Sequence, residues 1–373
     1  AVRALNGIEP TALRSLPERR HGEVVVDLPP WTPAKDAPQP ALAPFTQEAA
    51  AKLQTSWAEY LGRKPVQENS LGMSLALVPP GEFDAVYMDP NVSAIKPEMM
   101  RRRLRISQPF DLGATEVTVA QFRRFADATG YQTDAEKDGK GGHNSDGGEP
   151  KPEWNWKNPG SYKQTDDMPV VQVSWNDANA FCEWLSKEEG VRYRLPTEAE
   201  WEFACRAGSD GYHAVCEKER ELTQHAWVKE NGSAGGAFVR PVANWSANAF
   251  GLFDVLGNAW EWCADGGDRR SDERTHAVDP WGWFVYPSVR GCGFDVPAKD
   301  THPAFRRRHP YDLPRSSIGF RVLRQVSPEP PPGPLDRPLL VNRNGQLFRK
   351  ALVARPAPIP GLRSWSVELA GDG

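Results

Sequence analysis

Positions 194–208 read RLPTEAEWEFACRAG, and this string holds the signals of one short helix. Thr197 is followed three residues later by Glu200, the spacing of a capping box, in which two side chains bond to free backbone N–H groups at a helix start. From Trp201 onward the apolar residues recur at helical spacing, and Gly208 follows closely. The string therefore predicts a short helix with one buried face.

The same capping device occurs twice upstream. Thr118 is followed by Gln121, and Ser174 is followed by Asp177 inside the string PVVQVSWNDANAFCEW. Each pair predicts another short helix. Between these two helices lies 134–167, a polar segment without clear periodicity. A loop of that length inside a compact domain usually has a function.

The pattern around these helices divides the chain into four parts. We expect a proline-rich extended arm at 1–44 and a helix leading into the domain at 45–68. The domain itself is expected at 69–326, followed by a proline-rich linker and a short β tail at 327–373. The tail is too short to form a core of its own.

Strands are expected on both sides of the helices. The first covers 71–83 with a turn at its Pro-Pro-Gly sequence, and the second covers 104–112. After Gly208 the chain reads as short strands and turns. In the tail, 339–350 predicts a hairpin around an Asn-Gly pair.

Composition excludes several classes of protein. The chain has 373 residues with 45 basic and 49 acidic side chains, and this net charge of −4 argues against nucleic acid as the main partner. No apolar run reaches the ~18 residues of a membrane span. The absence of a CxxC motif argues against a zinc ribbon. Because the chain begins at Ala1, a signal peptide would not be visible.

Aromatic residues and cysteines are expected inside the domain. The 35 prolines, 32 glycines and 14 tryptophans predict a loop-rich body with an aromatic core. Cys182 and Cys205 lie on apolar helix faces and are expected to be buried free thiols. The tryptophans expected in the core or as loop anchors are Trp154, Trp156, Trp175, Trp201, Trp260 and Trp262.

Eight local strings resemble, in the same order, the formylglycine-generating enzyme family, also called the sulfatase-modifying-factor family. They lie at 69–83, 116–125, 130–137, 169–184, 194–208, 251–262, 290–291 and 318–322. The resemblance covers roughly two-thirds of the chain, from Asn69 to about Arg324. It implies an irregular α+β fold of the C-type-lectin-like kind, with low secondary-structure content.

The resemblance does not carry the family's catalytic chemistry with it. In the family's enzymes, two cysteines five residues apart bind copper(I), which suits soft thiolate ligands. The matching positions here hold Val296 and Thr301, and Gly293 replaces a serine of the preceding segment. Cys292 lies nearby, but one thiol cannot make a two-coordinate site. No catalytic residue and no copper are therefore expected, as in a pseudoenzyme.

An altered metal site is the alternative. Asp295, Asp300, His302 and His309 lie in the same stretch, and two histidines with a carboxylate can hold non-haem iron. The alternative function is thus a metal-dependent oxidase or oxygenase of the same family with changed ligands. In the simpler interpretation these are surface loop residues.

The resemblance also implies a structural calcium site. Its side-chain ligands match Asp254 and Glu261, and its backbone carbonyls match Gly257 and Ala259. Oxygen ligands of this mixture suit a hard cation. Alternatively, the two acids cap turns or pair with arginines.

We expect the chain to be a non-catalytic scaffold with a ligand-binding or protein-binding surface at 292–317. The expected ligand-binding residues are Phe294, Asp295, Val296, Phe305, Arg307, His309, Tyr311 and Leu313. Some relatives are retroelement-diversified variable proteins, with variation concentrated in this stretch. The run 306–309 is either a solvated or salt-bridged strand edge or an anion site.

The partner and the location stay open at this point. The sequence fits an unknown protein or carbohydrate ligand, and it fits one domain of a larger bacterial protein. Both a cytoplasmic and an exported location in a bacterium are compatible with it.

Overall fold

The computed structural model describes most of the predicted domain. The described residues are 28, 30–31, 34–87, 100–137, 139–145, 147–160, 162–216, 218–232, 238–266, 277–280 and 286–326, with the backbone of 339–342 and 347–350. Residues 1–27 of the proline-rich arm and the proline-rich linker lie outside them. No helix in the described part of the chain is both long and apolar enough to cross a bilayer.

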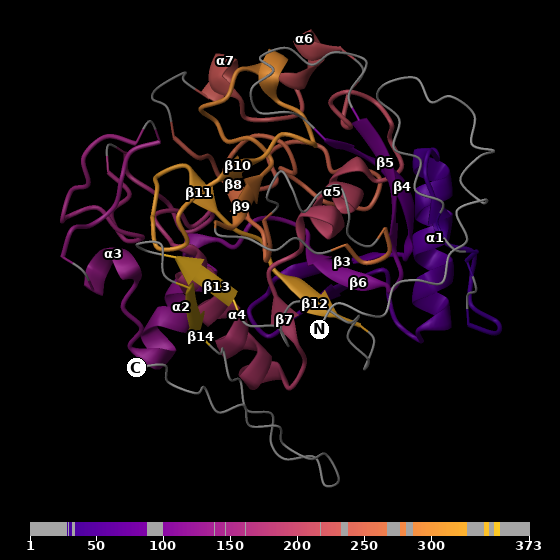
Figure 1. Cartoon of the computed structure of the whole chain (residues 1–373), viewed down its shortest axis with the longest axis horizontal. Helices are drawn as coiled ribbons and strands as arrows, with labels where there is room; N and C mark the ends of the chain where they lie inside the picture. The colour runs from indigo at the N-terminus through magenta and orange to yellow at the C-terminus, as the bar shows by residue number, and fades with distance from the viewer. Residues whose placement is uncertain are drawn as a thin grey trace, which may run out of the picture.

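Three small sheets form the framework (Figure 1). The central sheet is antiparallel in the order β2-β3-β6-β12-β7, with strands Val66–Glu68, Ser74–Val78, Phe110–Gly113, Leu323–Gln325 and Tyr193–Arg194. A second sheet has the order β1-β4-β5, with strands Ala41–Leu42, Gly81–Tyr87 and Met100–Ile106. The third has the order β10-β9-β8-β11, with strands Arg307–Arg308, Ser288–Arg290, Trp260–Trp262 and Ile318–Gly319.

Short helices connect and cover these sheets. They are α1 Gln47–Tyr60, α2 Val119–Thr129, α3 Asp134–Lys137, α4 Trp175–Glu189, α5 Glu198–Arg206, α6 Glu219–Leu222, α7 Lys229–Gly232 and one 3-10 turn, Ala298–Asp300. Figure 1 shows α1 along one side of the body, and α6 and α7 at the end opposite to α2 and α4. In the tail, β13 Leu339–Asn342 pairs with β14 Leu347–Lys350, which confirms the expected hairpin strands.

All three capping boxes are confirmed. At Thr118, Ser174 and Thr197 the hydroxyl accepts from the third backbone N–H, and the third side chain accepts from the cap N–H. The first two helices end at left-handed Gly130 and Gly190, where a glycine has no steric penalty. These helices form as predicted because their start and stop signals are local.

Both predicted strand segments are divided. The expected strand at 71–83 ends at Val78, and β4 begins after the two prolines at Gly81, where a Cβ would lie 2.1 Å from the carbonyl oxygen of Ala41. The expected strand at 104–112 becomes β5 and β6, which belong to different sheets. The break follows from a distant contact, since the backbone N–H of Ser107 donates to Asp279.

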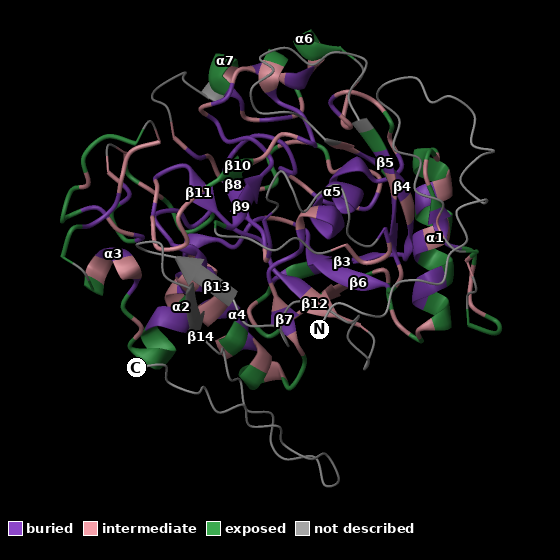
Figure 2. Ribbon diagram, in the orientation of Figure 1, coloured by how far each residue is buried: buried purple, intermediate pink, exposed green. Residues whose placement is uncertain are grey.

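The core is aromatic, as composition predicted. All six predicted tryptophans are buried, and Phe122, Phe181 and Phe320 form a ring cluster with centroids 5.5–6.4 Å apart. Figure 2 shows the buried residues gathered around the central strands and α5. The helix α1 docks on this body, since Gln54 donates to the carbonyl oxygens of Leu77 and Phe250.

Candidate functional site

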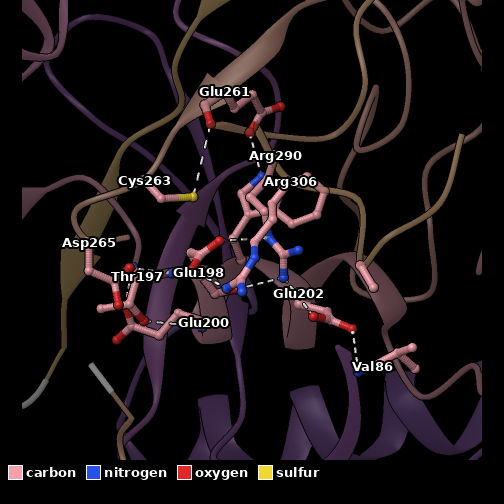
Figure 3. A network of polar contacts seen from close by, with 12 residues as sticks. Val86, Thr197, Glu198, Glu200, Glu202, Glu261, Cys263, Asp265, Arg290 and Arg306 are labelled. Atoms are coloured by element: carbon pink, nitrogen blue, oxygen red, sulfur yellow. Dashed lines mark hydrogen bonds and ion pairs between the residues drawn. The ribbon is translucent and has the colours of Figure 1, made fainter. Parts of the chain in front are cut away.

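The segment that follows β9 is held from below by a buried ion-pair network (Figure 3). Arg290, which is 4% exposed, donates to Glu202 at 2.6 Å and lies 3.9 Å from Glu198. Both acids come from α5, and Arg306 pairs with Glu198 at 3.2 Å. Arg206 bonds to Glu202 from one helical turn away. The network ties Arg290, the last residue of β9, and Arg306 to the helix α5.

The two positions matched to the copper ligands are closed into the protein. Val296 is 2% exposed and packs in the aromatic core. Thr301 is fully buried, and its hydroxyl donates to the carbonyl oxygen of Pro297 at 3.0 Å. Neither side chain has a thiolate, which is the donor that copper(I) prefers. The residues present therefore do not fit a copper ion.

The five cysteines of the chain do not replace the missing pair of thiolates. All lie within the described residues, and none forms a disulfide. Four of them are buried, including Cys182 and Cys205, as predicted. Burial raises the pKa of the Cys292 thiol to about 12, so this residue is not a ready nucleophile.

The predicted ligand-binding residues divide into two groups. Phe294 and Val296 are each 2% exposed and belong to core clusters, so the prediction that they contact a ligand is wrong. Their apolar side chains turn inward because the segment packs over the core. The other six are half-buried or exposed: Asp295, Phe305, Arg307, His309, Tyr311 and Leu313.

The exposed group centres on a stacked arginine. The Arg307 guanidinium lies 4.8 Å from the centroid of the Trp260 ring and 5.8 Å from that of Phe305. The Trp260 indole N–H donates to Asp295 at 3.1 Å, while the second oxygen of this carboxylate lies 4.0 Å from Arg307. Arg307 lies on the edge strand β10, as the strand-edge interpretation of 306–309 predicted, and it covers the buried ring of Trp260 in β8.

The four residues of the alternative metal site do not form one. His302 is 4% exposed, its Nδ1 accepts from the Ala304 N–H, and burial lowers its pKa to about 3. His309 instead lies edge-on to the Trp262 ring, 6.2 Å away between centroids. Within the described ranges, no three His, Cys, Asp or Glu side chains are arranged to hold a metal ion.

Two residues beside His302 escaped the sequence analysis. Tyr212 lies 4.5 Å from the rings of both His302 and His213, and His213 bonds to the carbonyl oxygen of Thr301. They come from a loop some 90 positions earlier, so no local pattern could place them there.

The predicted calcium ligands lie in a buried, charged cluster. Asp254 is 4% exposed; one of its oxygens accepts from the Ala243 N–H and the other has no hydrogen-bond partner. Glu261 is fully buried, and Arg321 donates to both of its oxygens at 2.6 Å. The Trp201 indole also donates to Glu261. A buried carboxylate oxygen without a donor fits a cation at Asp254, while Glu261 already has one in Arg321.

A third carboxylate, missed by the sequence analysis, belongs to this cluster. Glu116 is fully buried, and neither of its oxygens has a hydrogen-bond partner. Burial first, and then the charges of Asp254 and Glu261, raise its pKa well above the ordinary value. The sequence shows only an acid two residues before the cap Thr118, between Thr115 and Val117.

Two known proteins of similar sequence show which kind of protein this chain resembles. The chain is 35% identical over 235 residues to the formylglycine-generating enzyme of Thermomonospora curvata, which covers 54% of this chain and 74% of the enzyme. It is 32% identical over 185 residues to the mouse inactive C-alpha-formylglycine-generating enzyme 2, covering 42% of this chain and 58% of that protein.

A solved structure shares the architecture. PvdO from Pseudomonas aeruginosa matches with a TM-score of 0.57 and 26% identity, over 70% of this chain and 99% of its own. This likeness confirms the irregular α+β, C-type-lectin-like fold of the formylglycine-generating-enzyme type. The model of the sulfatase-modifying factor enzyme 1-like domain matches residues 63–326, and the chain therefore belongs to this family.

Proposed function

We propose that this chain is a non-catalytic member of its family that presents a ligand-binding surface around 292–317. One observation carries the proposal: Val296 and Thr301 occupy both copper-ligand positions, and both are closed into the core. The scaffold around them is intact, including the capped helices and the Arg290 network. A chain that keeps the fold but lacks both copper ligands can still use its surface to bind a ligand.

The relatives are compatible with this proposal. The family includes proteins named as enzymes and one named as inactive, so membership alone does not carry activity. The matched segment spans 58% of the inactive mouse relative, and the rest of that protein has no counterpart in the comparison.

The proposed surface consists of the half-buried and exposed residues Asp295, Phe305, Arg307, His309, Tyr311 and Leu313. Aromatic rings and an arginine are the side chains that most often dominate binding interfaces. A protein or carbohydrate ligand fits this composition. If the surface is diversified, the same locus in related strains will vary at 292–317, and variation spread evenly along the chain would contradict this version.

We also propose a structural calcium ion at the cluster of Asp254, Gly257, Ala259 and Glu261. The support is the buried Asp254 oxygen that lacks a partner, in a loop whose carbonyls supply further hard oxygen ligands. When bound, calcium would neutralise buried negative charge and fix the loop that precedes β8.

The first experiment tests for catalysis. The purified full chain is assayed for copper(I) binding, bound iron, oxygen uptake and conversion of a cysteine in a sulfatase peptide. We expect none of these in the natural chain. The double variant V296C/T301C should gain copper(I) binding, because it restores both soft ligands. Conversion of the peptide cysteine by the natural chain would overturn the proposal.

The second experiment tests the surface. Peptide and glycan arrays are probed with the natural chain, with the double variant F305A/R307A, and with K52A as a control on exposed α1. A true ligand should lose at least about tenfold in affinity with the double variant and nothing with the control. Ligands that are indifferent to F305A/R307A bind elsewhere and would contradict the proposed surface.

A further inference from the structure

The edge strand β10 leaves backbone hydrogen-bonding groups open on one side. It lies at the end of its sheet and pairs with β9, where Arg308 stands opposite Ser288. The next residue, His309, donates its N–H to the carbonyl oxygen of Pro287. Because alternate residues of an antiparallel pair bond to the neighbouring strand, the N–H and C=O of Arg308 point away from β9. Arg308 is exposed, so these groups lie at the open edge of the sheet.

The side chains of 306–308 alternate between the two faces of this sheet. Arg306 turns toward α5, where it pairs with Glu198 at 3.2 Å (Figure 3). Arg307 turns to the opposite face and stacks on the buried ring of Trp260. Arg308 returns to the face of Arg306 but is exposed. One arginine of the run is therefore structural, and two lie at the surface.

Arg307 is held in position without using its hydrogen-bond donors. The rings of Trp260 and Phe305 lie 4.8 and 5.8 Å from its guanidinium. One carboxylate oxygen of Asp295 lies 4.0 Å away, which is beyond hydrogen-bond distance, and the other already accepts from the Trp260 indole. Among the described residues, no acceptor forms a hydrogen bond with this guanidinium. Its N–H groups are therefore fixed in place and available to a ligand.

The open edge is positively charged. Arg307 and Arg308 are both exposed, and in the described part of the chain the Arg308 side chain has no ion-pair or hydrogen-bond partner. An edge strand with charged side chains resists pairing with a second copy of itself, since antiparallel pairing would place arginines opposite one another. A strand that carries carboxylates would instead meet opposite charge. The charge of the edge thus favours an acidic strand as its partner.

We propose that β10 takes an acidic, extended peptide segment of a partner protein as an additional strand. The backbone of the partner pairs with the outward N–H and C=O of Arg308, and its carboxylates accept from Arg307. The inference rests on the proposed function and deepens it, because it names the class of ligand that the surface at 292–317 binds. A glycan has no strand backbone with which to pair, so the open backbone groups favour a peptide.

The test uses the full chain and fluorescently labelled peptides, with binding measured by fluorescence anisotropy. One peptide alternates glutamate with valine, and a second carries glutamine in place of glutamate. A third keeps the glutamates but is N-methylated throughout, which removes every backbone donor and keeps the charge. We expect the first peptide to bind, and the other two to bind at least about tenfold more weakly, because each lacks one of the two kinds of contact.

Three variants separate the contacts on the side of the chain. R307Q should lower the affinity for the glutamate peptide by at least about threefold, because it removes the guanidinium that faces the carboxylates. R308P removes an outward N–H without removing a bond within the sheet, and R308Q removes the same charge but keeps the N–H. R308P should therefore bind about fivefold more weakly than R308Q. The control R101Q makes the same change at an exposed arginine of β5 and should leave the affinity unchanged.

The fold of the variants is checked by their midpoints of thermal unfolding. Equal midpoints in R308P and R308Q show that the proline leaves the sheet intact. If R308P unfolds earlier, the N-methylated peptide tests the same backbone contact on the natural chain.

Three outcomes overturn the inference. The first is equal binding of the glutamate peptide and its N-methylated form, which would show that charge alone is recognised. The second is heparin, a sulfated glycan, binding more tightly than the glutamate peptide with the same loss in R307Q. The third is a natural chain that does not bind the glutamate peptide at millimolar concentration. The proposed function survives each of these outcomes if the arrays return a ligand that is lost in F305A/R307A, and it fails by itself if they return none.

Discussion

Arg321 is fully buried, and we expect its replacement by methionine to cause a large loss of stability. The guanidinium donates to both oxygens of Glu261 in β8 at 2.6 Å. It also donates to the carbonyl oxygens of Gly113, at the end of β6, and Phe253, before β8, at 2.9 and 3.0 Å. One side chain thus joins two sheets and a loop.

The expected loss follows from these contacts. Removing one partner of a buried ion pair costs about 3–5 kcal/mol, because the other charge is left uncompensated. Each carbonyl that loses its donor costs roughly 1 kcal/mol more. Methionine fills much of the space, so a cavity adds little. R321M should therefore lower the free energy of unfolding by about 5–7 kcal/mol, a large share of the roughly 5–15 kcal/mol of a typical protein.

Urea unfolding followed by tryptophan fluorescence measures this loss, in a chelator so that bound cations do not contribute. The double variant R321M/E261Q should be more stable than R321M, because no charge then remains at position 261 while Trp201 keeps an acceptor. A loss below about 1 kcal/mol in R321M would refute the reasoning, since ordinary substitutions already reach that size. A double variant no more stable than R321M would refute it as well.

Three further predictions follow from single groups. Burial and the charge of Asp134 raise the pKa of Asp177 from 3.8 to about 7. The protonated side chain therefore stabilises the fold below about pH 4, and this stabilisation is lost as the pH rises through 7. The difference in stability between the natural chain and D177N should change by up to about 4 kcal/mol across that range, measured by urea unfolding at several pH values, and a constant difference would contradict it. Native alkylation mapped by mass spectrometry should modify Cys216 alone, because the other four cysteines are buried; labelling of Cys292 would be inconsistent with its position in the core. T197A should lower the free energy of unfolding by about 1 kcal/mol through loss of the cap of α5, and an unchanged denaturation midpoint would argue against the capping role.

Local signals were sufficient to predict the helices and the filling of the core. A capping box is complete within four residues, so Thr118, Ser174 and Thr197 could be identified as helix starts without any tertiary information. The tryptophans were predicted to be buried because so large an apolar side chain rarely remains exposed in a folded domain. The family, too, could be identified from ordered strings.

Contacts between distant segments could not be predicted in this way. The single strand expected at 104–112 is two strands because Ser107 bonds to Asp279, far along the chain. Phe294 and Val296 were expected on the surface because the segment diverges from the family, but divergence does not report which side chains turn inward. Glu116 could not be identified from the sequence as part of a buried acidic cluster, because Asp254 and Arg321, which interact with it, come from two other parts of the chain.

The same contacts explain how the scaffold keeps its shape without copper ligands. In this chain, the backbone at 290–296 is fixed by Arg290, which bonds to Glu202 of α5, and by the Phe294 N–H, which donates to the Asn258 carbonyl oxygen. None of these bonds involves the side chains at positions 296 or 301, so the support of this segment does not depend on a thiol at either position. Arg307, stacked on Trp260, lies on β10, which pairs with β9, and β9 ends at Arg290 of the buried network. A rigid support beneath an exposed edge suits the proposed binding function, because preorganised side chains lose little entropy when a ligand arrives.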